Sequence, residues 1–258
     1  MEFGYIIDIE EDLVSQILFA KQHFDFIEIT SSLDLSIYTE EFISNIKRAL
    51  KNFKAIGHIH WELSNLERHE PLEDIYASIE VLRKMGIKEI TIHPFWGEKM
   101  DLDEIKRYNS QALLEISNFC MKRNLQLLVE NIVTPPYNNA FNIMELTREI
   151  PNLGVTLDVG HANRISKLEL ERFIALLGDK IKHVHLHDNF KDFDHFAFRS
   201  MARLKRIMNV IRKLPNDTTI TLEIFYVRQN GERILISGEE RREILIKQLD
   251  MISKILDR

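Results

Sequence analysis

The chain has 258 residues, of which 45% are hydrophobic and 29% are charged. This composition is typical of a folded globular protein and excludes an intrinsically disordered chain. The net charge of −6 disfavours a dedicated nucleic-acid binder, although a local basic face would still permit one.

Apolar runs typical of strands alternate with amphipathic segments typical of helices. The predicted strands cover residues 5–7, 24–29, 55–60, 88–94, 125–131, 155–157, 181–188 and 218–225. The predicted helices cover residues 11–21, 39–53, 71–85, 102–123, 141–150, 168–177, 197–214 and 239–256. Gly86, Pro151 and Gly178 each directly follow one of these helices, as expected at helix C-termini.

This alternation predicts the fold class. Parallel neighbouring strands need helical crossovers, so strands that are each followed by a helix indicate a parallel sheet. Eight such units close into a (β/α)8 TIM barrel, which we predict as one domain over residues 1–258 because no linker or break in composition divides the chain. An open doubly wound sheet is the alternative, but it would not explain the polar residues at the strand ends.

Most of the predicted strands carry a carboxylate or a histidine near their C-terminal end. These residues lie 27 to 38 residues apart, about one strand–helix unit: Glu28, His60, His93, Glu130, Asp158, His185 and Glu223. A closed barrel directs the C-terminal ends of its strands toward one axial region, where barrel enzymes have their active sites. We therefore expect the active site at this end of the barrel.

Four of these residues suit a divalent metal. Glu130, Asp158, His185 and Glu223 end the last four strands, and three carboxylates at one point would repel one another without a cation. Three oxygens and one nitrogen leave two positions of an octahedral shell for substrate or water. Mn²⁺, Mg²⁺ or Co²⁺ would suit this set, and Zn²⁺ is an alternative. The competing interpretation, four unrelated polar caps, is weaker for residues in register on consecutive strands.

Three further histidines have alternative roles. His60 and His93 could ligate a second metal, bind a substrate hydroxyl or simply cap the barrel. His161 follows Asp158 by three residues, and we expect it to polarise a substrate carbonyl, with metal ligation as the alternative.

Another three histidines lie two residues from a strand-end histidine. His58 precedes His60, and His183 and His187 flank His185, so strand alternation places each on the same face as its neighbour. We interpret them as packing or supporting residues. Periodicity alone leaves open whether His185 or His187 is the ligand.

Aromatic and basic residues near the strand ends suggest substrate contacts. Trp61, Phe95 and Trp96 could pack on the apolar face of a sugar, or plug the barrel. The helix after the seventh strand is basic, which favours either a solvated face or a phosphate on the substrate: Arg199, Arg203, Lys205, Arg206, Arg212 and Lys213.

The motifs together resemble the xylose isomerase-like TIM barrel superfamily, which joins sugar isomerases and epimerases with endonuclease IV, an AP endonuclease of family 2. The resemblance covers nearly the whole chain. It rests on His60-Trp61, His93-Pro94, Glu130-Asn131, Leu157-Asp158-Val159-Gly160-His161, His185-Leu186-His187-Asp188 and Leu222-Glu223.

The resemblance implies roles for these residues. It favours His185 over His187 as the ligand, so that Glu130, Asp158, His185 and Glu223 would hold one divalent metal while His161 contacts substrate. The implied activity is isomerisation or epimerisation of a sugar or sugar phosphate through a metal-stabilised enediolate. One of the two glutamates would take the proton and the other would return it.

The alternative is an endonuclease IV-like, zinc-dependent cleavage of abasic DNA. That family has extra zinc ligands that match His60, His93 and His161, and an Asp-x-His pair after the seventh strand. Here Asp194 directly precedes His195, and Asp192 is three residues away. The family's glycines after that histidine are replaced by Phe198-Arg199-Ser200, a departure from both well-known sugar epimerases and the endonuclease.

A binding or regulatory protein on an inactive barrel ranks third, because the four central ligands are intact. We expect a cytoplasmic protein, since the single cysteine, Cys120, permits no disulfide within the chain and the start resembles no secretion signal. No run approaches the roughly 18 apolar residues of a membrane span. Phe196 and Phe198, if exposed, could form a homo-oligomer contact.

Overall fold

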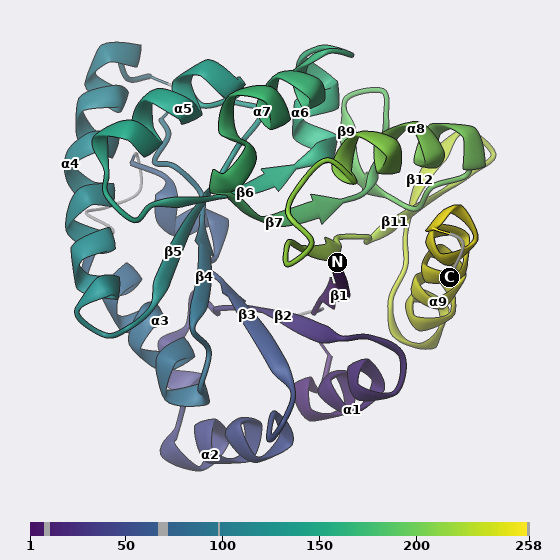
Figure 1. The fold of residues 1–258 in the computed structure, drawn as a ribbon. Helices are drawn as coiled ribbons and strands as arrows, with labels where there is room; N and C mark the ends of the chain where they lie inside the picture. Colours follow the sequence, from purple (N-terminus) through teal and green to yellow (C-terminus); the bar gives the residue numbers. More distant parts are fainter. Residues whose placement is uncertain (8–10, 67–71, 98, 257–258) are drawn as a thin grey trace.

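Eight parallel strands close into a barrel, as predicted (Figure 1). The computed structural model describes residues 1–7, 11–66, 72–97 and 99–256. Around the barrel the strands follow the order β1-β10-β7-β6-β5-β4-β3-β2. Their bounds are Glu2–Ile6 (β1), Phe26–Thr30 (β2), Lys54–His58 (β3), Glu89–Ile92 (β4), Gln126–Glu130 (β5), Gly154–Asp158 (β6), Ile181–Leu186 (β7) and Thr219–Leu222 (β10).

Helices surround the barrel (Figure 1). Their bounds are Leu13–His23 (α1), Glu40–Ala49 (α2), Leu72–Met85 (α3), Leu102–Met121 (α4), Ala140–Glu149 (α5), Val159–Ile165 (α6), Glu169–Leu177 (α7), Met201–Ile211 (α8) and Gly238–Leu256 (α9). The side chains of Thr39, Asp101 and Asn139 cap α2, α4 and α5 by accepting backbone N–H groups that have no partner inside the helix. Buried apolar side chains of the strands and helices form one continuous core.

A second, smaller sheet lies beyond the barrel strands. It has the order β12-β11-β9-β8 and consists of Asp188–Phe190 (β8), Phe193–Phe196 (β9), Tyr226–Gln229 (β11) and Glu232–Leu235 (β12). Asn230 and Gly231, both with positive φ, connect β11 and β12 in a two-residue turn of the kind that Asn-Gly favours. The segments that form this sheet follow β7 and β10, so the sheet stands next to the C-terminal end of the barrel.

Several predicted boundaries are wrong. The predicted strand over residues 55–60 ends at His58, because His60 instead caps a 3-10 helix at Trp61–Ser64. The predicted strand over residues 181–188 divides into β7 and β8, and the helix predicted to begin at residue 197 begins at Met201 because Ser200 caps it. The predicted start of the third helix, residue 71, lies outside the described residues.

The expected exposure of Phe196 and Phe198 is also wrong. Their side chains are 2% and 3% exposed, because the Phe196 ring packs between those of Phe190 and Tyr226 in the small sheet and Phe198 joins the hydrophobic core. They therefore cannot form the oligomer contact that the sequence left open. Cys120 is buried in the core. Among the described residues, no helix is both long and apolar enough to cross a membrane.

Candidate metal centre

The four predicted ligands come together at the C-terminal end of the barrel. Glu130, Asp158, His185 and Glu223 each offer a ligand atom, and these atoms all lie within 4.8 Å of one another. Nδ1 of His185 lies 3.1 Å from Oε2 of Glu223, 3.4 Å from Oε1 of Glu130 and 4.0 Å from Oδ2 of Asp158. All four side chains are buried.

The donor set fits a divalent cation. Within the described part of the chain, Oε2 of Glu130, Nδ1 of His185 and Oε2 of Glu223 are buried without a hydrogen-bond partner. Burying such atoms unpaired is costly. Nδ1 of His185 and Oε2 of Glu223 nevertheless lie 3.1 Å apart, and Oε2 of Glu130 lies 3.2 Å from Nε2 of His93, without hydrogen-bond alignment. Four side chains that each offer a ligand atom within 4.8 Å of the others have the arrangement of ligands around an ion.

The electrostatics of the cluster also demand positive charge. Burial alone would raise the pKa of Glu130, but the rings of His185 and His93 outweigh it and hold this pKa well below its usual range. Burial alone would lower the pKa of His185, but Glu28, Glu130 and Glu223 outweigh it and raise this pKa well above its usual value. A proton on His185 thus supplies the positive charge that a metal ion would otherwise provide.

Asp158 is held in place by its position between β6 and α6. It ends the strand and caps the helix, because its Oδ1 accepts the backbone N–H of His161 at 2.6 Å. Asn131 pairs with the Asp158 backbone through both its side-chain oxygen and nitrogen, at 2.8 and 3.0 Å. The end of β6, the cap of α6 and the two hydrogen bonds with Asn131 together fix the Asp158 carboxylate at the C-terminal end of the barrel.

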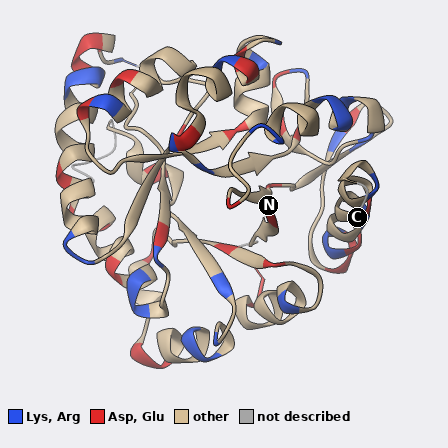
Figure 2. Ribbon diagram, viewed as in Figure 1, with Lys and Arg blue, Asp and Glu red and all other residues tan. Residues whose placement is uncertain are grey.

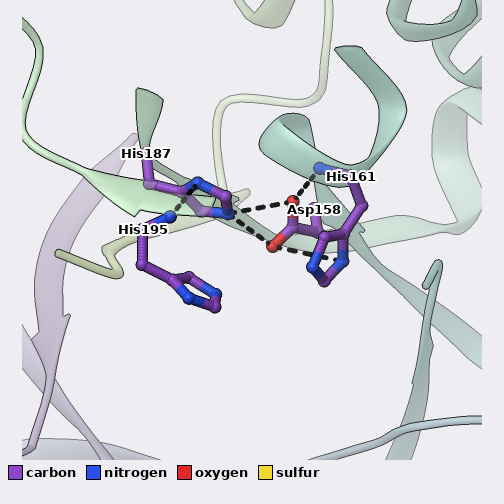
Figure 3. A group of neighbouring side chains, drawn as sticks. All are labelled: Asp158, His161, His187 and His195. Atoms are coloured by element: carbon purple, nitrogen blue, oxygen red, sulfur yellow. Dashed lines mark hydrogen bonds and ion pairs between the residues drawn. The ribbon is translucent and has the colours of Figure 1, made fainter. Parts of the chain in front are cut away.

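His187 hydrogen-bonds to Asp158 and does not belong to the cluster that contains Glu130 and Glu223. Its Nδ1 accepts the backbone N–H of His195 at 3.0 Å, so its Nε2 carries the hydrogen that it donates to Asp158 at 2.9 Å (Figure 3). Gly160 makes room for the ring, since a Cβ there would lie 1.9 Å from Cε1 of His187. Sequence periodicity could not separate His185 from His187, because both point into the barrel.

A second group of possible ligands adjoins the first. Nε2 of His93 and Nε2 of His58 lie 3.2 and 3.4 Å from Oε2 of Glu130. His60, for which ligation was one of three predicted roles, belongs to no cluster of possible ligands among the described residues; its Nδ1 accepts the backbone N–H of Glu62, and it lines the cavity described below. Sequence reasoning thus missed His58. The signal that could have identified it was its position on the strand. His58 lies two residues before His60, so both side chains lie on the same face of the strand and His58 lies deeper in the barrel.

A third group contains His161 and His195. With Asp158 and His187 they form a set whose ligand atoms lie within 4.8 Å of one another (Figure 3). Nδ1 of His161 donates to the carbonyl of Asn131 at 2.9 Å, so a neutral His161 ring presents Nε2 as an acceptor. Asp194 does not join this group, because its carboxylate pairs with Arg164 and Asn189.

His195 has an unusual backbone conformation. Its φ of 65° lies in the left-handed region, which is uncommon for residues other than glycine and is often found at functional sites. Its Nε2 lies 3.5 Å from Oε1 of Glu223. Removal of water from around the ring lowers the pKa of His195 to about 4, and the nearby His187 acts in the same direction. The ring is therefore neutral at physiological pH.

A cavity of about 590 Å³ opens above the three groups. Its polar wall includes His58, His93, Glu130, His161, His195 and Glu223. Its apolar lining includes Ile6, Ile7, Phe225 and Tyr226. A ligand in this cavity would thus meet both hydrogen-bonding groups and hydrophobic surface, as small-molecule sites commonly provide.

The predicted aromatic residues divide between the two expected roles. Trp61 lines the cavity, is 46% exposed, and stacks on Trp96 with ring centroids 6.0 Å apart and an interplanar angle of 19°. The ring of His60 is also stacked with that of Trp61, with centroids 6.2 Å apart. Phe95 is fully buried in the core, so it cannot touch a substrate.

None of the basic residues of α8 and its flanks lines this cavity among the described residues. Arg203 pairs with Asp188 at 2.8 Å, and Arg212 donates to the carbonyl of Ile255 at 2.7 Å. Positive and negative charges are interspersed over the outer helices (Figure 2). The structure therefore gives no support from α8 for a substrate phosphate in the cavity.

Comparison with known proteins places the chain in a family. Residues 18–254 match the xylose isomerase-like TIM barrel family, so the chain belongs to it. MJ1614, an uncharacterised protein of Methanocaldococcus jannaschii, is 24% identical over 201 residues, which are 73% of this chain and 76% of that protein.

Solved structures share the fold at low sequence identity. A D-psicose 3-epimerase crystallised in the presence of D-fructose aligns over 99% of each chain with a TM-score of 0.80 and 16% identity. The IolI protein with a bound zinc atom aligns over 99% of each chain with a TM-score of 0.76 and 18% identity. Endonuclease IV from Thermus thermophilus aligns over 98% of this chain and all of that one, with a TM-score of 0.71 and 15% identity.

Proposed function

We propose that the protein is a metal-dependent isomerase or epimerase of a sugar or sugar phosphate. The observation that carries this proposal is the pair of glutamates, Glu130 and Glu223, at the edge of one cavity and in one cluster with His185 and Asp158. Epimerases among the structures with this fold support the class of reaction, and IolI with its zinc supports the use of a metal.

Glu130, Asp158, His185 and Glu223 would hold the metal, which as a Lewis acid would polarise a substrate carbonyl and the neighbouring C–H bond. One glutamate, as the carboxylate, would remove the proton from the carbon next to the carbonyl. The other would return, from the opposite side, a proton that it has first taken up from water. Nearby histidines outweigh burial and lower the pKa of both carboxyl groups, so each is ionised and able to act as the base until it takes up a proton.

The remaining cavity residues would orient the substrate. His161 presents Nε2 as an acceptor when neutral, so it suits a substrate hydroxyl better than the carbonyl we expected from the sequence. Trp61 offers a flat face on which the apolar side of a sugar ring can pack.

The first test is elemental analysis of protein purified without chelator. About one divalent ion per chain supports the isomerase. The metal-loaded protein should then exchange the hydrogen next to the carbonyl of a ketose with solvent deuterium, across a panel of ketoses and their phosphates. Glu130→Gln and Glu223→Gln should each reduce this exchange by at least about 100-fold, the usual range for loss of a general base. Full turnover by either variant would contradict the assigned roles.

Endonuclease IV-like cleavage of abasic DNA is the second candidate. The three adjoining groups of possible ligands favour it, because they would suit more than one zinc ion. Two or three zinc ions per chain, with nicking of an abasic duplex and no deuterium exchange into sugars, would favour this activity. A metal-binding protein without either activity would be a binding or regulatory member of the family.

A further inference from the structure

One buried carboxylate near the metal centre takes no part in the proposed chemistry. Glu28 lies on β2 and is 0% exposed, inside the barrel. Its Oε1 lies 3.0 Å from Nε2 of His185, and its Oε2 lies 3.0 Å from Nε2 of His183. A buried carboxylate is costly unless it is paired, and these two rings supply its partners together with His58, whose Nδ1 lies 3.3 Å from Oε1.

The contact with His185 determines which ring nitrogen can reach the metal. A carboxylate accepts hydrogen bonds, so Nε2 of His185 carries a hydrogen and donates it to Glu28. The other nitrogen, Nδ1, is the atom that faces Glu130, Asp158 and Glu223. Glu28 therefore contacts one nitrogen of the His185 ring, and the three carboxylates of the metal centre face the other nitrogen.

We propose that Glu28 is a positioning residue that directs Nδ1 of His185 toward the metal centre and increases its strength as a ligand. The inference rests on the metal site of the proposed function but not on the reaction. A carboxylate behind a ligating histidine fixes the ring and raises its basicity, and loss of such a partner typically weakens metal binding 10–100-fold.

The neighbouring contacts distinguish this role from general packing. His183 binds the other oxygen of Glu28 and, through Nδ1, the hydroxyl of Thr219 at 2.7 Å. It belongs to the same buried network but to none of the clusters that include Glu130. His183→Gln keeps a donor for Glu28 and leaves the bond from Glu28 to His185 in place, so it is the matched control.

The experiment measures Co²⁺ binding to the full chain by its visible absorption and by competition with a chelator. Glu28→Leu removes both the acceptor and the charge, so we expect Co²⁺ affinity to fall about 100-fold with a changed spectrum. Glu28→Gln keeps an acceptor without the charge, so we expect a fall of about 10-fold with little spectral change. His183→Gln should bind Co²⁺ within about twofold of the wild type, because the His183 ring packs against His185 but its hydrogen bonds go to Thr219 and Glu28 and to none of the four candidate ligands.

Proton NMR of the Co²⁺ protein supplies a second readout. The wild type and His183→Gln should show a cobalt-shifted histidine N–H signal that is protected from exchange with water, and Glu28→Leu should lose that protection. Wild-type affinity and spectrum in Glu28→Leu would overturn the proposal. If Glu28→Leu does not fold, wild-type affinity in Glu28→Gln would overturn it.

Two further outcomes would also overturn the positioning role. If Glu28→Gln and His183→Gln reduced Co²⁺ affinity equally, the loss would come from general loosening of the buried network and not from the contact between Glu28 and His185. Loss of one of two bound ions in Glu28→Leu would make Glu28 a ligand itself. Failure of the isomerase proposal would give a different result. If the wild type and the variants bound Co²⁺ as expected but the wild type exchanged no sugar hydrogens, the isomerase proposal would fail and the positioning role of Glu28 would stand.

Discussion

Two of the four candidate ligands, Asp158 and His185, are held from behind by residues outside their cluster. His187 and the backbone of His161 bind Asp158, and Glu28 binds His185. The side chains therefore do not need to search for their orientation when an ion arrives. Such preorganisation reduces the entropy that binding costs and narrows the geometries that the site accepts.

Gly160→Ala tests the support of Asp158. A Cβ at residue 160 would collide with the His187 ring, which must then move away from Asp158. We expect the free energy of unfolding to fall by about 1–3 kcal/mol, as for other overpacked sites, and metal affinity to fall as well. Urea denaturation and metal titration measure the two effects.

Gly4→Ala is the control for that substitution. A Cβ there would lie 2.6 Å from the Phe26 ring, away from the candidate ligands. We expect it to lower stability but not metal affinity. Equal loss of metal affinity in both variants would show that Gly160 has no specific part in positioning Asp158.

The buried His183 predicts how stability depends on acid. Burial lowers its pKa, and Glu28 only partly offsets this, so the ring stays neutral in the folded protein. As pH falls below about 6.5 the unfolded chain takes up a proton here that the folded chain does not, and stability is lost at up to about 1.4 kcal/mol per pH unit. The loss ends once pH falls below the lowered pKa.

His183→Gln should therefore approach the wild type as the solution becomes acidic. At pH 7.5 the metal-free variant should be less stable, because it loses buried contacts. Between pH 6.5 and the lowered pKa of His183, the difference in unfolding free energy should shrink, as urea denaturation at each pH would measure. A constant difference across this range would mean that His183 does not resist protonation.

At the scale of elements, the small sheet positions His195 over the cavity. Phe225 donates its backbone N–H to the carbonyl of His195 at 3.0 Å, and Ala197 donates to the carbonyl of Tyr226 at 2.9 Å. The segment that begins β11 thus holds β9 on both sides of Phe196. The β11–β12 turn should therefore influence the cavity although it lies outside the barrel.

Gly231→Ala tests this connection. Its φ of +84° is unfavourable for alanine, so the turn should be destabilised by about 1 kcal/mol. We expect faster amide exchange in β8, β9, β11 and β12 and lower turnover, with metal affinity unchanged because the ligands precede β11. Gly86→Ala has a similar strain at the end of α3 and should leave exchange in the small sheet unaltered.

The sequence was sufficient for the barrel but not for this sheet. Long apolar runs alternating with helices predict parallel strands, and strand ends meet at one edge, so Glu130, Asp158, His185 and Glu223 could be grouped. The extra strands are only three or four residues long, and the pairing of β9 with β11 joins distant segments. Asn230-Gly231 was the one local signal of a hairpin.

Sequence periodicity also could not distinguish the positions of His58 and His60, because contacts between distant segments decide them. Residues two apart on a strand share a face, so periodicity cannot say whether His58 or His60 lies at the depth of the ligands. Pairing of β3 with β4 ends at His58, and only three-dimensional contacts reveal this. Glu28 within an apolar run was visible as an anomaly, but its partners His183 and His185 are more than 150 residues away.

At the scale of the whole molecule, metal removal should lower thermal stability. Without the metal, the three carboxylates of the metal centre would repel one another with no cation between them. A metal that binds only the folded state also stabilises that state by mass action. At a metal concentration about 100 times Kd, we expect chelation to lower Tm by roughly 5–10 °C. Scanning calorimetry measures this shift, and Asp158→Ala should show much less of it. An unchanged Tm after verified metal loss would contradict a structural contribution of the ion.

The first barrel strand pairs with the last, β10, and Arg241 of α9 donates to the carbonyls of Ile6 and Ile224. Because a ribosome delivers the N-terminus first, β1 is made long before the strand that completes it. No nascent chain that stops short of Glu223 can close the barrel or present its full set of ligands. Any metal would therefore be selected only after β10 and Glu223 have been made, when the ions available in the surrounding compartment would compete for a newly completed site.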